Sequence, residues 1–185
     1  LRTVLEADVA DARFREWEMP VNSDSNFWTY LDRGERLPDA EAYRRYIGRM
    51  RDLPRYFDQQ IANMEAGLAR GFTPPRVTLE GRDASIRAFL RPAADNPFFG
   101  AFRSMPSTIP ADEQKRLRAE GEKAISEAVI PAYRKLLDFW LTRYLPGART
   151  TLAARDLPQG DAYYRSEVRE YTTLDLSPEQ IHPIG

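Results

Sequence analysis

The sequence contains no cysteine and only one histidine among its 185 residues. Disulfides and thiolate metal sites are therefore excluded, as is any site within this chain that needs two imidazoles. Lysine and arginine total 27 against 28 aspartates and glutamates, which leaves a formal net charge of -1. Nucleic-acid-binding proteins usually carry a basic excess or a basic stripe, so we expect no nucleic-acid partner.

The chain also lacks a long apolar run. No stretch approaches the roughly 18 consecutive apolar residues of a transmembrane helix, so we expect no transmembrane segment. A glycine-rich phosphate loop, a nucleophile elbow and a His-Glu-x-x-His zinc helix are all missing. The sequence therefore carries no complete catalytic constellation, and we predict no catalytic residue within it.

What the chain does carry is helical periodicity, most clearly between residues 111 and 144. Apolar or small residues recur there every three or four positions, which places them on one face of an α-helix: Leu117, Gly121, Ala124, Ile125, Ala128, Ala132, Leu136, Phe139, Trp140 and Tyr144. Pro146-Gly147 would end this helix, so we expect one long helix over about 111–145. Pro131 removes the amide donor to the carbonyl of Glu127, which predicts a kink.

A second apolar stripe predicts a helix that begins after Asp39, a good N-cap, and ends at Gly71. Pro54 lies inside it and leaves two readings open, a kinked helix or two abutting helices. Pro75 suits the first turn of a further helix, with a short strand at 77–79 as the rival reading. Residues 93–110 are rich in proline and predict a loop.

Three more helices are expected near the ends of the chain. One covers residues 1–18, one runs over about 162–171 with Asp161 as its cap, and one begins at Ser177-Pro178-Glu179-Gln180, a capping box. Apart from the rival strand at 77–79, we find no convincing β pattern. The predicted fold class is all-α, a single helical region over residues 1–185 built from kinked helices packed antiparallel.

The tyrosine-rich helix supplies the candidate binding residues. Tyr164 and Tyr171, with Arg165 and Arg169 nearby, offer hydroxyl and guanidinium donors for a peptide carbonyl or a terminal carboxylate. Tyr163 and Tyr164 are adjacent, so they point about 100° apart on a helix, and one should pack inward. We predict Tyr164, Tyr171, Arg165 and Arg169 as substrate-cleft residues; the alternative is that all three tyrosines belong to the core.

Glu179 and His182 stand in Glu-x-x-His spacing, which di-iron carboxylate bundles use to ligate metal. Such sites need two of these pairs and further glutamates, and this chain has a single histidine. The residue after His182 is proline, which disfavours helix at the histidine. We therefore predict no metal site and no cofactor in this chain, with this pair as the weak candidate.

Several motifs are also shared with a known family. A Leu-Pro-x-Gly turn at 157–160 is followed by a tyrosine-rich helix that ends in Thr172-Thr173, and by a Ser-Pro-Glu-x-Ile-His-x-x-Gly element at 177–185. The sequences at 71–75, 130–133 and 144–146 fit the same pattern. Together they resemble a bacterial family known as domain of unknown function 885.

The resemblance implies a large, mostly helical protein similar to zinc metallopeptidases of the gluzincin type. In that family the histidines and glutamates of the zinc site lie downstream of the His-x-x-Gly element, so no zinc ligand or catalytic glutamate carries over to this chain. Zinc is expected only in the full-length protein. Family members are often exported, to the periplasm for example, or lipid-anchored.

The chain begins at Leu1 already in helical pattern and stops at Gly185 just after a helix start, so we expect it to be part of a longer protein. The first hypothesis is that it forms one wall of the substrate cleft of a zinc-dependent, peptidase-like hydrolase. Its partners would then be the downstream half of the same protein and a peptide substrate. The alternative is a non-catalytic helical scaffold or interaction module; a small carboxylate–metal bundle using Glu179 and His182 is the third reading.

The single histidine and the absence of cysteine lead to a prediction about zinc binding. Zinc sites use three or four protein ligands, mostly cysteine and histidine, so the 185-residue chain should bind no zinc tightly. Elemental analysis after dialysis is expected to show far less than one zinc per chain. A stoichiometric zinc that EDTA removes would contradict the prediction.

Overall fold

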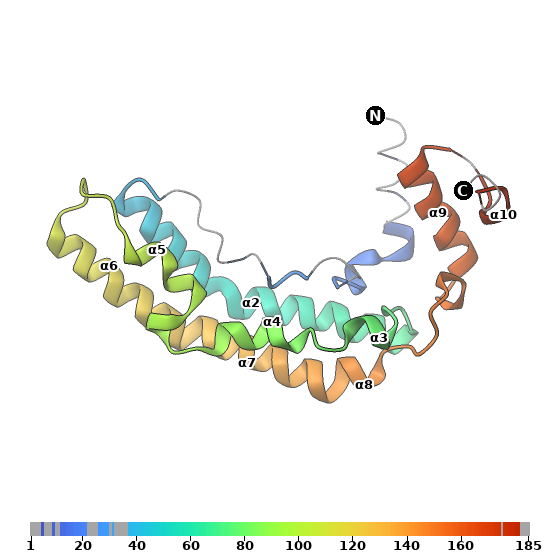
Figure 1. Cartoon of the computed structure of the whole chain (residues 1–185), viewed down its shortest axis with the longest axis horizontal. Helices are drawn as coiled ribbons and strands as arrows, with labels where there is room; N and C mark the ends of the chain where they lie inside the picture. Colours follow the sequence, from blue (N-terminus) through green and yellow to red (C-terminus); the bar gives the residue numbers. More distant parts are fainter. Residues whose placement is uncertain are drawn as a thin grey trace.

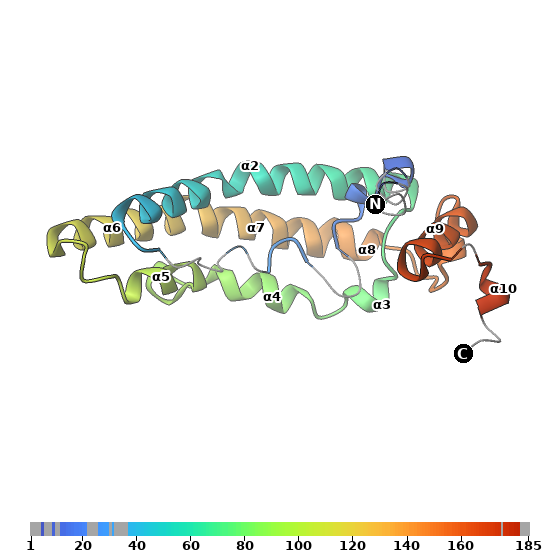
Figure 2. The same cartoon turned by 90° about the horizontal axis from the view of Figure 1, so that it is seen from above.

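The computed structural model describes residues 5, 9, 12–21, 26–29, 31, 37–174 and 176–181. The regular elements in these ranges are all helical, and the one β feature among them is an isolated antiparallel bridge between Val21 and Asn26. The predicted all-α class is confirmed. Two long helices lie side by side and form a curved rod, and the C-terminal helices turn away at one end (Figures 1 and 2).

The first long helix, α2, spans Ala40–Arg70. Its N-terminus is capped as predicted, because Asp39 Oδ1 accepts a hydrogen bond from the amide of Ala42 at 2.8 Å. It ends at Gly71, whose φ of 75° lies in the left-handed region that glycine adopts without a Cβ penalty. The helix runs through Pro54 without a break, so the reading of two abutting helices is wrong.

The second long helix runs continuously from residue 111 to residue 147, 37 residues in all, and it is kinked as predicted. Two segments of it are wider π-helical turns. In chain order its parts are α6 (Ala111–Ala124), the π-segment η5 (Ile125–Val129), α7 (Ile130–Phe139), the π-segment η6 (Trp140–Tyr144) and α8 (Leu145–Gly147).

Each π-segment comes two residues before a proline, Pro131 in one case and Pro146 in the other. A proline ring inside an α-helix clashes with the carbonyl four residues earlier. Those carbonyls belong to Glu127 and Thr142, and both lie within the π-segments. The wider turn gives the ring room, so the helix bends and continues instead of stopping at Pro131.

Between the two long helices the chain returns along their length in short pieces. These are α3 (Arg76–Leu79), α4 (Asp83–Arg87), η2 (Ala88–Leu90), η3 (Ala93–Asp95), η4 (Pro97–Phe99) and α5 (Gly100–Arg103). Helix is found at 77–79, so the rival reading of a strand there is wrong. The loop expected over 93–110 is partly wrong as well, because short helices occupy 93–95 and 97–103.

Because this segment returns, α2 and the 111–147 helix run in the same direction (Figure 1). The expected antiparallel packing therefore holds between the return segment and each long helix, while the two long helices are parallel. Acidic and basic side chains pair across them in chain order: Arg44 with Glu113, Arg51 with Glu120, Asp58 with Lys135 and Glu65 with Arg143. An antiparallel arrangement would bring the basic end of α2 against Lys135 and Arg143.

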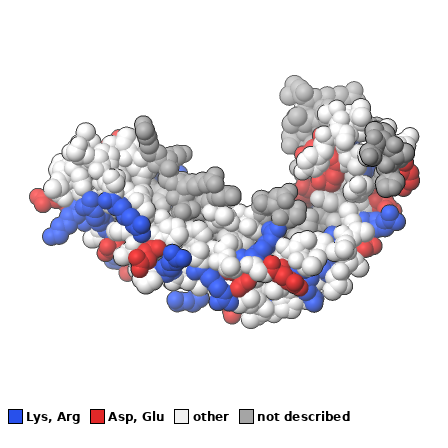
Figure 3. Space-filling view, viewed as in Figure 1, with Lys and Arg blue, Asp and Glu red and all other residues white. Residues whose placement is uncertain are grey.

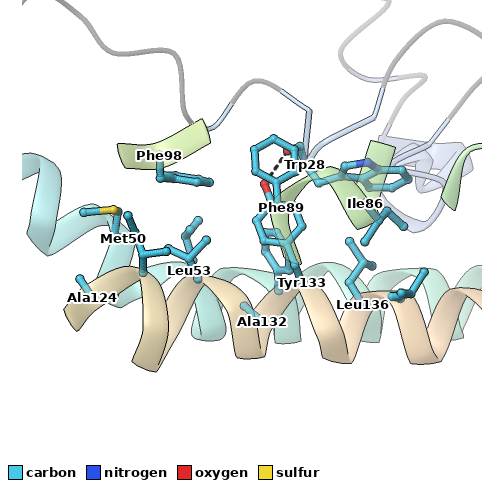
Figure 4. Packing of buried hydrophobic residues seen from close by; sticks show 14 of the residues in the cluster. Trp28, Met50, Leu53, Ile86, Phe89, Phe98, Ala124, Ala132, Tyr133 and Leu136 are labelled. Atoms are coloured by element: carbon cyan, nitrogen blue, oxygen red, sulfur yellow. Dashed lines mark hydrogen bonds between the residues drawn. The ribbon is translucent and has the colours of Figure 1, made fainter. Parts of the chain in front are cut away.

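The core is an aromatic layer between these three parts of the chain (Figure 4). The ring of Tyr133 on α7 lies 4.8 Å from that of Phe57 on α2 and stacks at 4.4 Å on that of Phe89. The Tyr133 hydroxyl donates to the carbonyl of Trp28 at 2.7 Å, and the indoles of Trp28 and Trp140 pack edge to face. One residue, Tyr133, thus ties four segments together.

A smaller second cluster carries the C-terminal elements, η7 (Ala154–Asp156), α9 (Gly160–Thr172) and α10 (Pro178–Ile181). It consists of Phe14, Phe72, Leu157 and Tyr163. The N-cap of α9 is Gln159 in a left-handed conformation, so the expectation that Asp161 caps this helix is wrong. Asp161 lies in the first turn instead, where it favours the positive end of the helix dipole.

Half of the helix expected over residues 1–18 lies outside the described residues; residues 5, 9 and 12–14 are helical, and the α-helix ends at Arg15, whose φ of 55° is left-handed. Its described end is a short 3₁₀ helix, η1 (Glu16–Glu18), which packs on the end of α2. The buried carboxylate of Glu18 pairs with Arg70, whose guanidinium lies 4.1 Å above the ring of Phe72.

Two helical glycines of α2 provide a matched test of this contact. A Cβ on Gly67 would overlap the carbonyl oxygen of Glu18 and lie 2.9 Å from that of Phe72, whereas a Cβ on Gly48 meets nothing within 4 Å. Gly67→Ala should therefore destabilise the protein by about 1–3 kcal/mol. Gly48→Ala should stabilise it by about 0.5–1 kcal/mol through helix propensity alone. Urea unfolding of both variants measures the difference, and equal effects would contradict the close approach.

A second test concerns Tyr144, whose buried hydroxyl has no hydrogen-bond partner within the described part of the chain. Burial raises the pKa of Tyr144 above its ordinary value of 10.0. The folded state then holds the phenol proton more tightly than the unfolded chain, so stability is lost as the pH rises above about 10. Tyr144→Phe should leave stability at pH 7 unchanged or higher and reduce the alkaline loss. Thermal melts at pH 7 and pH 10.5 check this, and a large loss at pH 7 would show a missed partner.

Candidate functional site

A pocket of about 590 Å³ lies where η7, α9 and α10 meet. Polar and charged side chains from all three elements line it. The lining residues are Ala153, Ala154, Arg155, Asp161, Tyr164, Arg165 and Glu179. The site thus combines two guanidinium groups, two carboxylates and one phenol hydroxyl.

The tyrosine side chains of helix α9 point in different directions. Tyr163 is buried and packs edge-on against Phe14 and Phe72, with ring centroids 5.4 and 5.5 Å apart. Its neighbour Tyr164 lies about 100° further round the helix and faces the pocket with 42% of its surface exposed. The alternative that all three tyrosines belong to the core is therefore wrong, because Tyr171 is 82% exposed.

The pocket contains only half of the predicted cleft residues. Tyr164 and Arg165 line it, whereas Tyr171 and Arg169 do not. The cleft role of all four residues stays a prediction, and the pocket gives a structural setting for the first two alone.

Close packing between η7 and the start of α9 closes one side of the pocket. A Cβ on Gly160 would overlap the carbonyl oxygens of Ala154 and Arg155, so this contact requires glycine. The amide of Gly160 donates to the carbonyl of Leu157 at 2.8 Å, which holds the intervening turn. The turn thereby brings Arg155 beside α9, although Arg155 was not among the predicted residues. The Leu-Pro-x-Gly motif was the available sequence signal for this return.

Glu179 enters the pocket from the capping box of α10. The amide of Ser177 donates to Gln180 Oε1 at 2.8 Å and the amide of Gln180 donates to Ser177 Oγ at 3.3 Å, so the predicted box is confirmed. The pKa of Glu179 lies below its ordinary value, because its own backbone amide and the Ser177 hydroxyl hydrogen-bond to its charged form. Arg155 and Arg165 add attraction to the same carboxylate.

This environment bears on the metal hypothesis for Glu179 and His182. The carboxylate of Glu179 already has hydrogen-bond donors, and two arginines make the surroundings unfavourable for a cation. His182 lies outside the described residues. Across the ranges that the structure describes, no group of three or more histidine, cysteine, aspartate or glutamate side chains is placed to hold a metal ion.

Arg155, Arg165 and Tyr164 can donate hydrogen bonds to carbonyl or carboxylate oxygens, and Asp161 can accept one from an amide. Such a set of groups suits recognition of a polar chain better than bond cleavage. The face shown in Figure 3 is mixed in charge, and basic residues alternate with acidic ones along its lower edge. None of the described helices is both long enough and apolar enough to span a bilayer.

These features define a curved all-α unit with a polar pocket at one end. The chain belongs to the bacterial DUF885 family, described as a bacterial protein of unknown function, whose family model matches residues 1–185. The resemblance to this family is thereby confirmed. The family description assigns no activity, and no curated protein matches the chain.

A solved structure shares the fold. It is "the crystal structure of the putative lipoprotein from Colwellia psychrerythraea", similar with a TM-score of 0.76 at 23% sequence identity. The match covers 83% of this chain and 27% of that one. The chain thus corresponds to about a quarter of the length of this structural neighbour.

Proposed function

We propose that this chain forms one wall of a substrate cleft in a peptidase-like hydrolase, and that the pocket on α9 holds part of a peptide. The observation that carries the proposal is the pocket itself, which is lined by the donors Tyr164, Arg155 and Arg165 and by the acceptor Asp161. A peptide backbone offers a carbonyl and an amide at each residue, so these groups are complementary to it.

The hydrolytic chemistry would belong to the rest of the protein. Zinc, where a full-length protein holds it, activates a water molecule for attack on a peptide carbonyl. Among the described residues no three potential ligands lie together, and the carboxylate of Glu179 is already hydrogen-bonded by its own amide and the Ser177 hydroxyl, so we assign zinc to the rest of the protein. The role proposed for this chain is therefore to bind and orient substrate, with no catalytic step assigned to it.

A second candidate is a non-catalytic scaffold that binds a partner protein. Large apolar side chains are exposed around the C-terminal elements, namely Leu152, Tyr164, Tyr171 and Leu174. Exposed apolar residues that gather in one patch are typical of interaction surfaces, and these four all lie between residues 152 and 174 of the chain. The two candidates differ in whether the hydroxyl of Tyr164 matters for turnover.

The cellular location follows as a further proposal. The structural neighbour is described as a putative lipoprotein. We infer an exported or lipid-anchored location for the full-length form of this protein as well.

The cleft role predicts the effect of removing single hydroxyl groups. In the full-length protein, Tyr164→Phe should lower kcat/KM for peptide substrates by roughly 3–10-fold, the value of one hydrogen bond. The hydroxyl faces the pocket and the side chain is part-exposed, so the melting temperature should hardly change. Peptide hydrolysis assays and thermal melts measure the two effects separately.

Tyr171→Phe is the matched comparison, because Tyr171 lies on the same helix but outside the pocket. Loss of turnover in both variants would support the full predicted pair, and loss in Tyr164→Phe alone would restrict the cleft to the pocket. If both variants keep wild-type turnover on every peptide that the parent protein cleaves, the cleft role is wrong. The scaffold then becomes the better explanation.

A further inference from the structure

The arginines of α2 fall into two rows with different surroundings. One row faces the 111–147 helix, where Arg44 and Arg51 pair with Glu113 and Glu120. The other row follows the helix with spacings of four, three and three residues, which keeps its members on one face: Arg45, Arg49, Asp52 and Arg55.

This second row lines a hollow surface. Two pockets, of about 470 and 380 Å³, lie along α2, and Arg49 and Asp52 line both of them. The two pockets therefore join into one groove, which we call the α2 groove. Its first part contains Arg45 and Leu37, and its second part contains Arg55 and Tyr56.

The groove is electropositive because two of its three arginines have no carboxylate partner. Arg45 reaches Glu41 at 3.7 Å, which is a long and exposed pair. Within the described part of the chain, Arg49 and Arg55 have no carboxylate within 4.0 Å. The guanidinium of Arg49 lies instead 5.7 Å above the ring of Tyr46. Among the described residues, Arg45, Arg49 and Arg55 against Glu41 and Asp52 leave a local charge of about +1 at neutral pH.

The floor of the groove is apolar. In its second part the partly buried side chains of Leu31 and Tyr56 offer apolar surface, beside Met50 and Phe98, which are buried in the main core. An occupant must therefore carry both negative charge and an apolar side chain to match the groove. A peptide that alternates acidic and apolar residues has this composition.

Nucleic acid fits the groove less well, although it too is anionic. Single strands bind on exposed aromatic faces, whereas the ring of Tyr46 is buried and that of Tyr56 packs against Phe27 and Phe57. The carboxylate of Asp52 would repel a continuous row of phosphates, whereas an alternating peptide can place an uncharged residue beside Asp52, which can then accept a hydrogen bond from its backbone amide.

We propose that the α2 groove binds a peptide segment of alternating acidic and apolar residues, with Arg49 and Arg55 pairing with its carboxylates. This site lies on different residues from the α9 pocket and does not depend on the peptidase-like function. Arginine–carboxylate pairs give geometric specificity as well as affinity, because the planar guanidinium can donate two parallel hydrogen bonds.

The test is a binding titration on the whole chain, followed by fluorescence anisotropy. The probe is a fluorescein-labelled Leu-Glu-Leu-Glu-Leu-Glu peptide, and a Leu-Lys peptide of the same length is its charge-reversed counterpart. The acidic peptide should bind, its affinity should fall with added NaCl because the arginines are exposed, and the basic peptide should not bind. Absence of saturable binding of the acidic peptide would overturn the proposal.

Two double variants locate the binding site. Arg49→Gln with Arg55→Gln should weaken binding of the acidic peptide by roughly tenfold or more, as expected for losing two charge-assisted hydrogen bonds. Lys115→Gln with Lys123→Gln removes the same charge from exposed positions of α6 and should change it less than twofold. All four side chains are exposed, so both variants should keep the wild-type melting temperature.

If both double variants weaken binding of the acidic peptide equally, the binding depends on overall charge and the proposed site is wrong. A fluorescein-labelled oligothymidylate is titrated in the same way, to test for nucleic-acid binding. If it binds as tightly as the acidic peptide and with the same dependence on Arg49 and Arg55, the groove is a nucleic-acid site and the peptide proposal is wrong.

Discussion

The burial of one aromatic layer positions the rest of this chain. Tyr133 contacts Phe57 on α2 and Phe89 on the return segment, and its hydroxyl donates to the backbone of Trp28. An aromatic side chain buries a large apolar area, and its rings and hydroxyl also fix relative orientation. The two long helices and the return segment are thereby held at a common point near the middle of the rod, and the surfaces at its two ends depend on that alignment.

Charged pairs favour the parallel direction of the two long helices but contribute little to their stability. Three of the four cross-helix pairs join partners that are about half-exposed, where an ion pair contributes about 0–1 kcal/mol. Their arrangement is nevertheless specific. Along the chain, the paired residues of α2 are basic, basic, acidic and acidic, and those of the 111–147 helix are acidic, acidic, basic and basic. Reversing either helix would bring like charges together, so the pattern discriminates against the antiparallel alternative.

The two proposed binding surfaces lie on opposite parts of this frame. The α2 groove uses side chains of a helix that belongs to the main core, whereas the α9 pocket is held by the second cluster around Tyr163. The pairing of Arg70 with Glu18 and the close approach at Gly67 fasten that cluster to the end of α2. Both surfaces therefore sit on packed helices instead of free loops, which suits recognition that depends on fixed geometry.

The sequence by itself determined the helices and several of their ends. The cap at Asp39, the left-handed end at Gly71 and the capping box at Ser177 depend on hydrogen bonds between near neighbours, so local residue types are sufficient to predict them. The same holds for the kink at Pro131 and for the different directions of Tyr163 and Tyr164, which follow from helix geometry.

Only the tertiary structure decided how these pieces combine. The parallel direction of the long helices follows from the return segment, and periodicity along one helix carries no information about the direction of its neighbour. The α9 pocket likewise depends on Arg155 and Glu179, which approach α9 from either side through a turn and a second helix. Their meeting is a contact between separate elements, set by packing around Gly160 and Tyr163 instead of by local propensity. The helices of this protein can therefore be predicted from local residue types, whereas its binding surfaces form only when the helices pack.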